Sequence, residues 1–343
     1  MAPNLPTRQL GKDGPQVTAL GFGLMGLSIF YGKKLPDDQR LAFLDHVFAS
    51  GETFWDSSDV YGDSEDLLGQ WFKKTGNRSK IFLCTKFANV RLPDGKSKVI
   101  NDPAYIREAC AKSHKRMGLE PGDAIDLYYC HRIDPKQPIE ITVQTMAELK
   151  KEGKIRYLGL SECSAETLRR ACKVHHIAAV QVEYSPFSMD IEHNGLLAAC
   201  RELGVAVVAY SPFSRGFLTG TIKSHDDFEP DDRRRVMPRY SKENFPKNIE
   251  LVHAISALAE KKGATPGQLT LAWLMAQGDN IIPIPGTTKV KNFEENMGSL
   301  KIQLTKEEEQ EIRAKVEAAE ITGDRYPEYM LGNLYVDTVP LKA

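Results

Sequence analysis

The chain lacks the features that mark secreted, membrane-spanning and nucleic-acid-binding proteins. No run of about 18 consecutive apolar residues, the minimum for a membrane-spanning helix, occurs in the sequence. Residues 1–8 contain no apolar segment of the kind found in secretory signal peptides. The formal net charge of −1 gives no long-range attraction to nucleic acid or to an anionic membrane. We therefore expect a cytoplasmic protein that binds neither nucleic acid nor membrane.

Cysteine is present, but not in a pattern that builds disulfides or zinc sites. The six cysteines are Cys84, Cys110, Cys130, Cys163, Cys172 and Cys200. They lack the paired short spacings of zinc ligands, and two of them lie in apolar, strand-like runs. Buried, reduced thiols and no metal site are therefore expected, as in cytosolic proteins.

Strand and helix signals alternate along most of the chain. Expected strands cover 19–23, 53–57, 81–86, 124–130, 155–160, 179–183, 206–210 and 281–284. Expected helices cover 37–50, 64–74, 103–117, 139–152, 165–175, 194–203 and 249–277, the last one broken at Thr265-Pro266. Eight such steps without a linker predict an α/β fold, a single (β/α)₈ TIM barrel that spans residues 1–343 as one domain.

Three segments fall outside this alternation. Residues 8–20 contain Lys12-Asp13-Gly14 between short alternating runs, which predicts an N-terminal β-hairpin that caps the barrel. Residues 214–247 form a long loop after the seventh strand, and loops of this length are functional lids or disordered insertions. The stretch after Glu320 has no period, and it either covers the barrel mouth or frays.

The glycines of segment 21–26, GFGLMG, match the dinucleotide-binding pattern G-x-G-x-x-G without its context. That pattern requires a helix to begin on the glycines and an acidic residue about 20 positions later at the end of a strand. Here Gly32 and Pro36 interrupt any such helix, and Asp45 falls inside a later one. We therefore reject a doubly wound fold and expect these glycines to let the backbone approach a ligand at the barrel mouth.

Four polar residues stand at or just past the ends of three successive strand-like runs. They are Asp56, Tyr61, Lys86 and His131. In a parallel α/β barrel the C-terminal ends of the strands converge on the face where active sites form. Each residue alone has an ordinary explanation as a cap, a packing tyrosine, a solvated charge or a loop histidine. Their joint occurrence on consecutive strands favours a catalytic group.

The four residues together form a proton donor. An unperturbed tyrosine has a pKa of about 10, and a nearby ammonium lowers it. We expect Lys86 to supply the ammonium, Asp56 to hold Lys86 in place, and Tyr61 to release its proton more easily as a result. His131 would donate a hydrogen bond to a carbonyl oxygen where negative charge develops. No nucleophile accompanies them, so a hydride donor is the natural complement.

At these residues the chain resembles the aldo-keto reductase family, and the resemblance extends over nearly the whole sequence. It rests on FWDSSDVYG at 54–62, on Lys86 closing the third strand, on YCHRIDP at 129–135 and on KIRYLGLS at 154–161. The histidine motif resembles the branch that contains pyridoxal reductases and auxin-induced-protein-like members from plants and fungi. The resemblance implies NADPH-dependent reduction of aldehydes or ketones, with Tyr61 as the general acid, Lys86 and Asp56 tuning it, and His131 orienting the carbonyl.

The resemblance also implies a set of cofactor contacts. Ser161, Glu162 and Gln181 would meet the nicotinamide carboxamide, although the family commonly has asparagine at the position of Glu162, and Tyr210 would stack on the nicotinamide ring. The pyrophosphate would lie along Ser211, Pro212, Phe213, Arg215, Gly216 and Leu218, with Gly26 nearby.

The eighth strand is followed by a candidate phosphate site, since the loops after strands 7 and 8 commonly bind phosphate in this barrel. Thr287, Thr288 and Lys289 would hold a 2′-phosphate, and Glu295 and Asn296 would reach adenine. Gly286 and Asn292 are expected to belong to the same cofactor site. The family often has arginine or glutamine at the position of Asn292, so the strength of an NADP preference stays open. An ordinary capped surface helix is the alternative.

The expected substrate is a small carbonyl compound, and the sequence does not name it. Phe30, Tyr31, Trp55, Phe87, Asn89, Tyr326 and Tyr329 are expected to line an aromatic mouth. An oligomer is compatible with the sequence but not indicated by it. One rival is a cofactor-sensing regulatory subunit of the potassium-channel β type. A metal-dependent barrel hydrolase is disfavoured, because segment 21–26 offers no His-x-His ligand pair.

Overall fold

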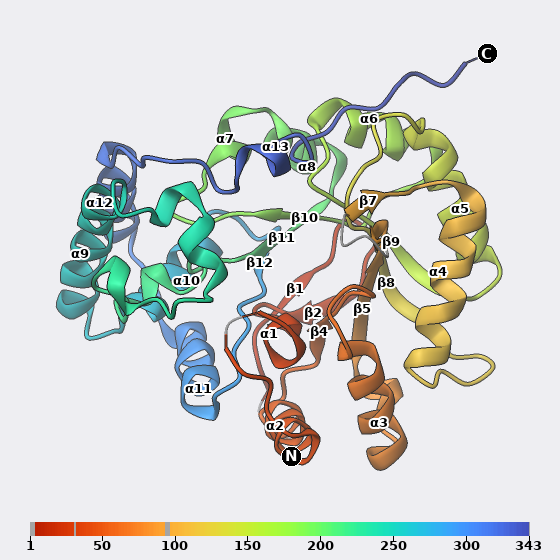
Figure 1. Ribbon diagram of the computed structural model, residues 1–343, viewed down its shortest axis with the longest axis horizontal. Helices are drawn as coiled ribbons and strands as arrows, with labels where there is room; N and C mark the ends of the chain where they lie inside the picture. Colours follow the sequence, from red (N-terminus) through yellow and green to blue (C-terminus); the bar gives the residue numbers. More distant parts are fainter. Residues whose placement is uncertain (1–3, 31, 93–96, 343) are drawn as a thin grey trace.

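A curled sheet of parallel strands forms the centre of the molecule. The structure is a computed structural model that describes residues 4–30, 32–92 and 97–342. Along the eight-stranded sheet the strands follow the chain order (Figure 1). They are β3 (Phe22–Gly23), β4 (Phe54–Asp56), β5 (Phe82–Phe87), β8 (Ile125–Cys130), β9 (Ile155–Ser161), β10 (Ala179–Glu183), β11 (Ala206–Tyr210) and β12 (Ile281–Pro283). The predicted (β/α)₈ barrel is confirmed.

Two backbone hydrogen bonds close the barrel between its first and last strands. The N–H of Gly21 donates to the carbonyl of Pro283 at 2.9 Å, and the N–H of Gly23 donates to the carbonyl of Pro285 at 3.2 Å. A Cβ on Gly23 would lie 2.9 Å from the carbonyl oxygen of Ile284, which is too close. We call this junction the barrel seam. The expectation that these glycines make room for a ligand is therefore corrected at Gly21 and Gly23, which make room for the neighbouring strand.

Helices alternate with the strands and form the outer layer (Figure 1). They are α2 (Asp37–Ala49), α3 (Ser64–Thr75), α4 (Pro103–Arg116), α5 (Ile139–Lys151), α6 (Ala165–Val174), α8 (Leu196–Leu203), α9 (Phe245–Lys262), α10 (Pro266–Ala276), α11 (Val290–Gly298) and α12 (Lys306–Ala318), with the short α1 (Met25–Ser28), α7 (Asp190–His193) and α13 (Glu328–Leu331). The predicted break is present, since α9 ends at Lys262 and α10 begins at Pro266. Thr265 caps α10 through a reciprocal capping box with Gln268. No described helix is long and apolar enough to cross a membrane.

Successive residues of each strand point alternately into the barrel and toward the helices. Phe54, Cys84 and Tyr129 belong to a buried cluster inside the barrel. Trp55 and Tyr128, their neighbours in sequence, belong to the larger cluster between strands and helices. This alternation decides which strand residues can reach the catalytic face.

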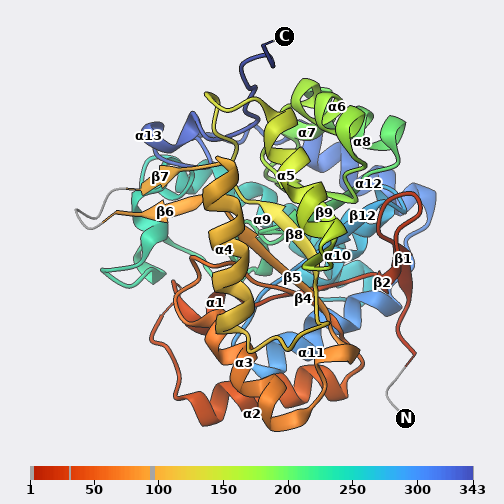
Figure 2. The ribbon, with the colours of Figure 1, turned by 90° about the vertical axis from the view of Figure 1, so that its right-hand side faces the viewer.

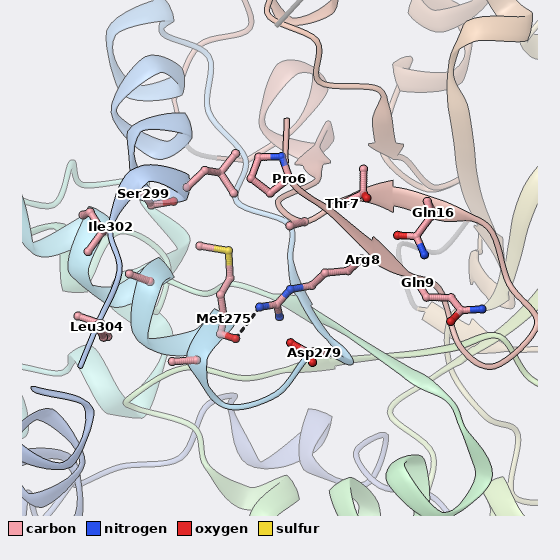
Figure 3. Close-up of a pocket in the computed structure, with 14 residues that line it drawn as sticks. Pro6, Thr7, Arg8, Gln9, Gln16, Met275, Asp279, Ser299, Ile302 and Leu304 are labelled. Atoms are coloured by element: carbon pink, nitrogen blue, oxygen red, sulfur yellow. Dashed lines mark hydrogen bonds between the residues drawn. The ribbon is translucent and has the colours of Figure 1, made fainter. Parts of the chain in front are cut away.

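The predicted N-terminal hairpin closes the end of the barrel that lies opposite the strands' C-terminal ends. β1 (Thr7–Gln9) pairs antiparallel with β2 (Gln16–Thr18), and Leu10 and Val17 pack into the cluster inside the barrel. Arg8 donates to the carbonyls of Met275 at 2.6 Å and Gly278 at 2.7 Å. Beside it lies a cavity of about 580 Å³ (Figure 3). Arg8 thus anchors the hairpin to the end of α10, and the cavity lies between the hairpin and this end of the helix.

The long loop after β11 folds around side chains of its own. It contains short 3₁₀ turns η2 (Phe217–Thr219), η3 (His225–Asp227), η4 (Arg233–Val236) and η5 (Pro238–Tyr240). Phe217, Phe228, Tyr240 and Phe245 pack edge-to-face and are buried, so the loop has its own aromatic core. A second hairpin that the sequence did not predict, β6 (Asn89–Arg91) with β7 (Ser97–Val99), extends from the end of β5 (Figure 2).

Candidate active site

A buried ion pair at the ends of β4 and β5 forms the base of the site. The ammonium of Lys86 donates to Asp56 Oδ1 at 2.5 Å and to the carbonyl of Ser57 at 2.6 Å. Gln181, from β10, donates to the other oxygen of Asp56 at 2.9 Å. Lys86 is fully buried and Asp56 nearly so. The predicted contact between Asp56 and Lys86 is therefore present, and Gln181 orients the carboxylate.

Tyr61 and His131 lie above this ion pair. The Lys86 ammonium is 5.0 Å from the centre of the Tyr61 ring. The rings of Tyr61 and His131 meet edge-to-face with centroids 5.8 Å apart. Ser58 lies within hydrogen-bond distance of His131 Nδ1, at 3.1 Å. The four residues that the sequence placed at successive strand ends are thus neighbours in space.

The charge states of this group follow from burial and from the ion pair. Burial works to lower the pKa of Lys86, but the negative charge of Asp56 outweighs it and the pKa is raised. Burial raises the pKa of Tyr61, and this outweighs the opposing effect of Lys86. The expectation of a lowered tyrosine pKa is thus corrected, because desolvation is the larger effect. Burial, with Arg132 and Lys86, holds the pKa of His131 well below its usual range, so its imidazole is neutral at pH 7.

Residues predicted to contact the nicotinamide lie at the ends of β9 and β11. Ser161 accepts a hydrogen bond from Arg132 at 3.3 Å. Glu162 is fully buried with a left-handed backbone, φ +51°. Its carboxylate accepts the phenolic hydrogen of Tyr210 at 2.7 Å. Ser161, Glu162 and Tyr210 therefore share one edge of the barrel mouth with Gln181.

The C-terminal segment covers this edge. Arg325 donates to both carboxylate oxygens of Glu162 at 3.3 Å, and both side chains are buried. The Tyr326 hydroxyl lies 3.2 Å from that of Tyr210. The N–H of Val336 donates to the carbonyl of Glu162 at 3.0 Å. Of the two alternatives for this stretch, the structure shows the one in which it covers the mouth.

Two of the predicted substrate contacts are wrong. Trp55 is fully buried, packs against Trp71 at 4.8 Å and donates to the carbonyl of Glu52 at 3.0 Å. Phe87 is fully buried and stacks on Tyr128 at 4.9 Å in the same layer. Trp55 precedes Asp56 and Phe87 follows Lys86, so the alternation of side chains along a strand turns both aromatic rings outward.

The remaining aromatic residues divide between the mouth and the surface. Phe30 has a left-handed backbone and lies 4.4 Å beneath the guanidinium of Arg233, a contact that joins the segment after α1 to the loop after β11. Tyr326 lies at the mouth, whereas Tyr329 is 81% exposed. Tyr31 lies outside the described residues. Asn89 is half-buried in β6.

The turn after β11 is strained in the way that functional loops often are. Ser211, Ser214 and Arg215 have left-handed φ values of +49°, +47° and +55°. The N–H groups of Gly216 and Leu218, expected to contact pyrophosphate, both donate to the carbonyl of Phe213. The side chains of Leu218 and Pro212 are buried in the protein. The Arg215 side chain is also buried and donates to Glu183 at 3.2 Å. Among these predicted contacts, a ligand could therefore reach most readily the half-buried Ser211, Phe213 and Gly216.

The loop between β12 and α11 lies beside α1. A Cβ on Gly26 would be 3.9 Å from the methyl group of Thr288, so these two predicted contacts are neighbours. Thr287 and Thr288 are half-buried, and Lys289 is exposed at the N-cap position of α11. Gly286 packs against the backbone of Gly23 at the barrel seam.

The predicted cofactor contacts on α11 differ in their accessibility. Asn292 is exposed, and Asn296 is 8% exposed. Glu295 accepts a hydrogen bond from Thr265 at 2.7 Å, so its carboxylate is tied to the cap of α10. Asn292 is thus the most accessible of these predicted contacts.

Sequence reasoning missed several residues of the site. Arg132, Arg325, Ser58 and Asp59 all contact predicted site residues or their partners. Arg132, Ser58 and Asp59 lie inside the quoted motifs, so proximity to Asp56 and His131 was an available signal. Arg325 comes from a segment without periodicity, and no signal marked it.

The sequence of the chain is similar to those of known proteins. The model of the aldo/keto reductase family matches residues 19–317. Aldo-keto reductase str7 of Strobilurus tenacellus is 53% identical, over 98% of this chain and 99% of its own length. Aldo-keto reductase yakc [NADP(+)] of Schizosaccharomyces pombe is 49% identical, again over 98% and 99%.

Solved structures agree with the sequence relatives. The glycerol dehydrogenase of Gluconobacter oxydans superposes with a TM-score of 0.82 at 25% identity, covering 93% of this chain and 97% of its own. A thermostable aldo-keto reductase solved with the inhibitor epalrestat superposes with a TM-score of 0.73 at 26% identity, covering 91% and 100%. The chain therefore belongs to the aldo/keto reductase family.

Proposed function

We propose that this protein reduces aldehydes and ketones to alcohols with NADPH, and that Tyr61 is the general acid. The observation that carries the proposal is the Lys86–Asp56 ion pair, buried directly beneath Tyr61 and beside His131. A charged, buried ammonium at this place stabilises the phenolate that forms when Tyr61 gives up its proton. The raised pKa of Tyr61 keeps the phenol protonated, and thus able to donate, at neutral pH.

His131 positions the substrate in this proposal. Its imidazole is neutral, so it can carry a hydrogen on Nε2 and donate it to the carbonyl oxygen. Tyr61 and His131 would then hold the same oxygen from two sides. Such a pair of donors favours the state in which negative charge develops on that oxygen.

The residues at the ends of β9, β11 and β12 fit a nicotinamide dinucleotide. Ser161 and Gln181 place a hydroxyl and an amide group beside Tyr210. The strained turn at Ser211–Arg215 places a buried guanidinium, paired with Glu183, beside the path expected for the pyrophosphate. Lys289 stands exposed at the start of α11, where a 2′-phosphate would gain both its charge and the helix N-terminus. NADPH, when bound, would supply the hydride. The name of the yeast relative, which prints NADP(+), supports the choice of this cofactor.

We also propose that residues 1–343 act as one barrel unit in a reducing compartment, the cytoplasm. The cysteines support this, since five of the six are buried and none is paired in a disulfide among the described residues.

The test is oxidation of NADPH, followed at 340 nm, across a panel of aliphatic, aromatic and heteroaromatic aldehydes including pyridoxal. We expect turnover with several of them, and a lower KM for NADPH than for NADH. Tight NADPH binding without turnover of any aldehyde would instead favour the regulatory-subunit alternative. Absence of both binding and turnover would refute the proposal.

A further inference from the structure

A chain of hydrogen bonds runs from His131 away from the proposed substrate. The Ser58 hydroxyl lies 3.1 Å from His131 Nδ1 and 3.1 Å from Asp59 Oδ1. Ser58 is fully buried, and Asp59 is partly buried. The N–H of Val60 also approaches the Ser58 oxygen, at 3.5 Å. The proposed function gives Ser58 and Asp59 no role.

The Ser58 hydroxyl has a single hydrogen, so it can donate to Asp59 or to His131 but not to both. When Asp59 is ionised, its carboxylate accepts that hydrogen. The Ser58 oxygen must then accept from His131, which places the imidazole hydrogen on Nδ1. When Asp59 is protonated, it can donate to the Ser58 oxygen instead. Ser58 then donates to Nδ1, and the imidazole hydrogen resides on Nε2.

The two arrangements differ in what His131 presents to a substrate. With the hydrogen on Nε2, His131 donates to a carbonyl oxygen. With the hydrogen on Nδ1, Nε2 presents a lone pair, which repels that oxygen. A neutral histidine must adopt one of these tautomers, and His131 is held neutral by burial.

We infer that Asp59, acting through Ser58, sets the tautomer of His131 and thereby switches its ability to position a carbonyl substrate. Asp59 is a positioning residue in this scheme, because it touches neither the substrate nor the reacting atoms. The kinetic consequence rests on the proposed function, whereas the tautomer change does not.

The surroundings of Asp59 place its ionisation in the working range of an enzyme. Glu65 on α3, Arg116 and Tyr105 on α4, and Tyr128 on β8 are the titratable or charged groups that face it. Burial, followed by the negative charge of Glu65, raises the pKa of Asp59 to about 7, and Arg116 opposes this rise. The switch is therefore expected to move between its two positions near neutral pH.

His131, Tyr61 and Lys86 titrate away from this interval, because the pKa of His131 is well below its usual range and those of Tyr61 and Lys86 are raised above theirs. Burial also raises the pKa values of the carboxyls of Asp56 and Glu65. The Asp59→Asn variant therefore assigns a transition near pH 7 to Asp59.

The direct test is ¹⁵N NMR of the imidazole nitrogens in the full-length protein, between pH 5.5 and 8.5. His131 resonances are assigned by their loss in His131→Asn. We expect the hydrogen on Nε2 at low pH and on Nδ1 at high pH, with a midpoint near 7. Ser58→Ala and Asp59→Asn should each abolish the transition. Asp38→Asn, which removes an exposed carboxylate on α2, should leave it unchanged.

The kinetic test is the pH profile of kcat/KM for a neutral aldehyde. Above the midpoint the wild-type value should fall by about tenfold per pH unit, because the donating tautomer is lost in proportion to ionised Asp59. In Ser58→Ala the profile should be flat over the same interval, while the affinity for NADPH is unchanged.

These two measurements separate the ways in which the idea can fail. A single His131 tautomer across the pH range, or an unaltered transition in Ser58→Ala, would overturn the switch whatever the enzymatic activity. A tautomer change without aldehyde turnover would leave the switch standing and count against the proposed function. NADPH binding measured by fluorescence verifies that each variant is folded.

Discussion

Tyr210 donates its phenolic hydrogen to Glu162 across 2.7 Å. The family resemblance implies that Tyr210 stacks on the nicotinamide, and this ring is thus oriented by the carboxylate of Glu162. Arg325 neutralises that carboxylate from the C-terminal segment. The covering of the barrel mouth and the orientation of Tyr210 therefore depend on the same buried ion pair.

Removal of one partner of this pair should be costly. Arg325→Met leaves the buried charge of Glu162 without its cation, and we expect a loss of about 3–5 kcal/mol in the free energy of unfolding. The double variant Glu162→Gln/Arg325→Met should regain a large part of it, because no unpaired charge remains. Denaturant unfolding of the four members of this double-mutant cycle measures the coupling. Additive losses would mean that the two side chains do not interact.

Tyr61→Phe keeps the ring over Lys86 and removes the transferable proton. Reduction should fall by about 10²–10⁴-fold, the usual contribution of one acid-base group, or by more. The affinity for NADPH should be nearly unchanged. Steady-state kinetics and fluorescence titration provide the two readouts. A similar loss of both would identify Tyr61 as structural.

Lys289→Ala tests the proposed 2′-phosphate site. The side chain is exposed, so its removal should not disturb the fold. We expect the KM for NADPH to rise about tenfold, which corresponds to about 1.4 kcal/mol, with little change for NADH. Lys291→Ala, another exposed lysine two residues further along, serves as the matched control. Equal effects on both cofactors would place the 2′-phosphate elsewhere.

The barrel seam requires glycine at position 286, whereas position 332, outside the seam, does not require it. A Cβ on Gly286 would lie 2.7 Å from the carbonyl oxygen of Gly23, whereas one on Gly332 would meet nothing within 4 Å. Gly286→Ala should therefore destabilise the protein by about 1–3 kcal/mol, as overpacking does. Gly332 has a φ of −62°, and Gly332→Ala should be tolerated. Thermal unfolding of the two variants makes the comparison, and equal stability would contradict the close approach.

The raised pKa of Asp59 has a consequence for stability with a definite sign. Between the unfolded pKa of about 3.9 and the folded value of about 7, the folded state binds more protons, so stability decreases as pH rises. Asp59→Asn cannot ionise and escapes this loss. Its melting temperature relative to wild type should therefore increase from pH 4 to pH 7 and then level off. A difference independent of pH would show that Asp59 has an ordinary pKa.

Much of the fold, and the meeting of Asp56, Tyr61, Lys86 and His131 at one end of the barrel, could be predicted because local signals agreed with the global arrangement. Eight alternating strand and helix patterns suffice for the barrel, and polar residues at strand ends must converge on one face. The helix cap at Thr265-Pro266 and the hairpin turn at Lys12-Asp13-Gly14 are recognisable from the residue types that such caps and turns prefer. These features need only the chain's local sequence.

The errors came from properties that depend on the assembled structure. Trp55 and Phe87 lie next to Asp56 and Lys86 in sequence, yet alternation along the strand places their side chains on the opposite side. The pKa of Tyr61 depends on how completely the protein removes water, which the presence of Lys86 does not reveal. Arg325 contacts Glu162 across 163 positions of sequence, and no local sequence pattern around either residue predicts that contact.

The barrel seam joins Gly21 to Pro283, residues that are separated by most of the chain. During synthesis β3 can pair with β4 but not with the segment around Pro283, because that segment is made much later. Contacts at such a sequence separation form late and carry a high entropic cost in folding. The exposed edge of β3 during this interval is open to pairing with other chains. Chaperone dependence and the yield of soluble protein should accordingly respond more to changes at Gly21, Gly23 and Gly286 than to changes in the catalytic group.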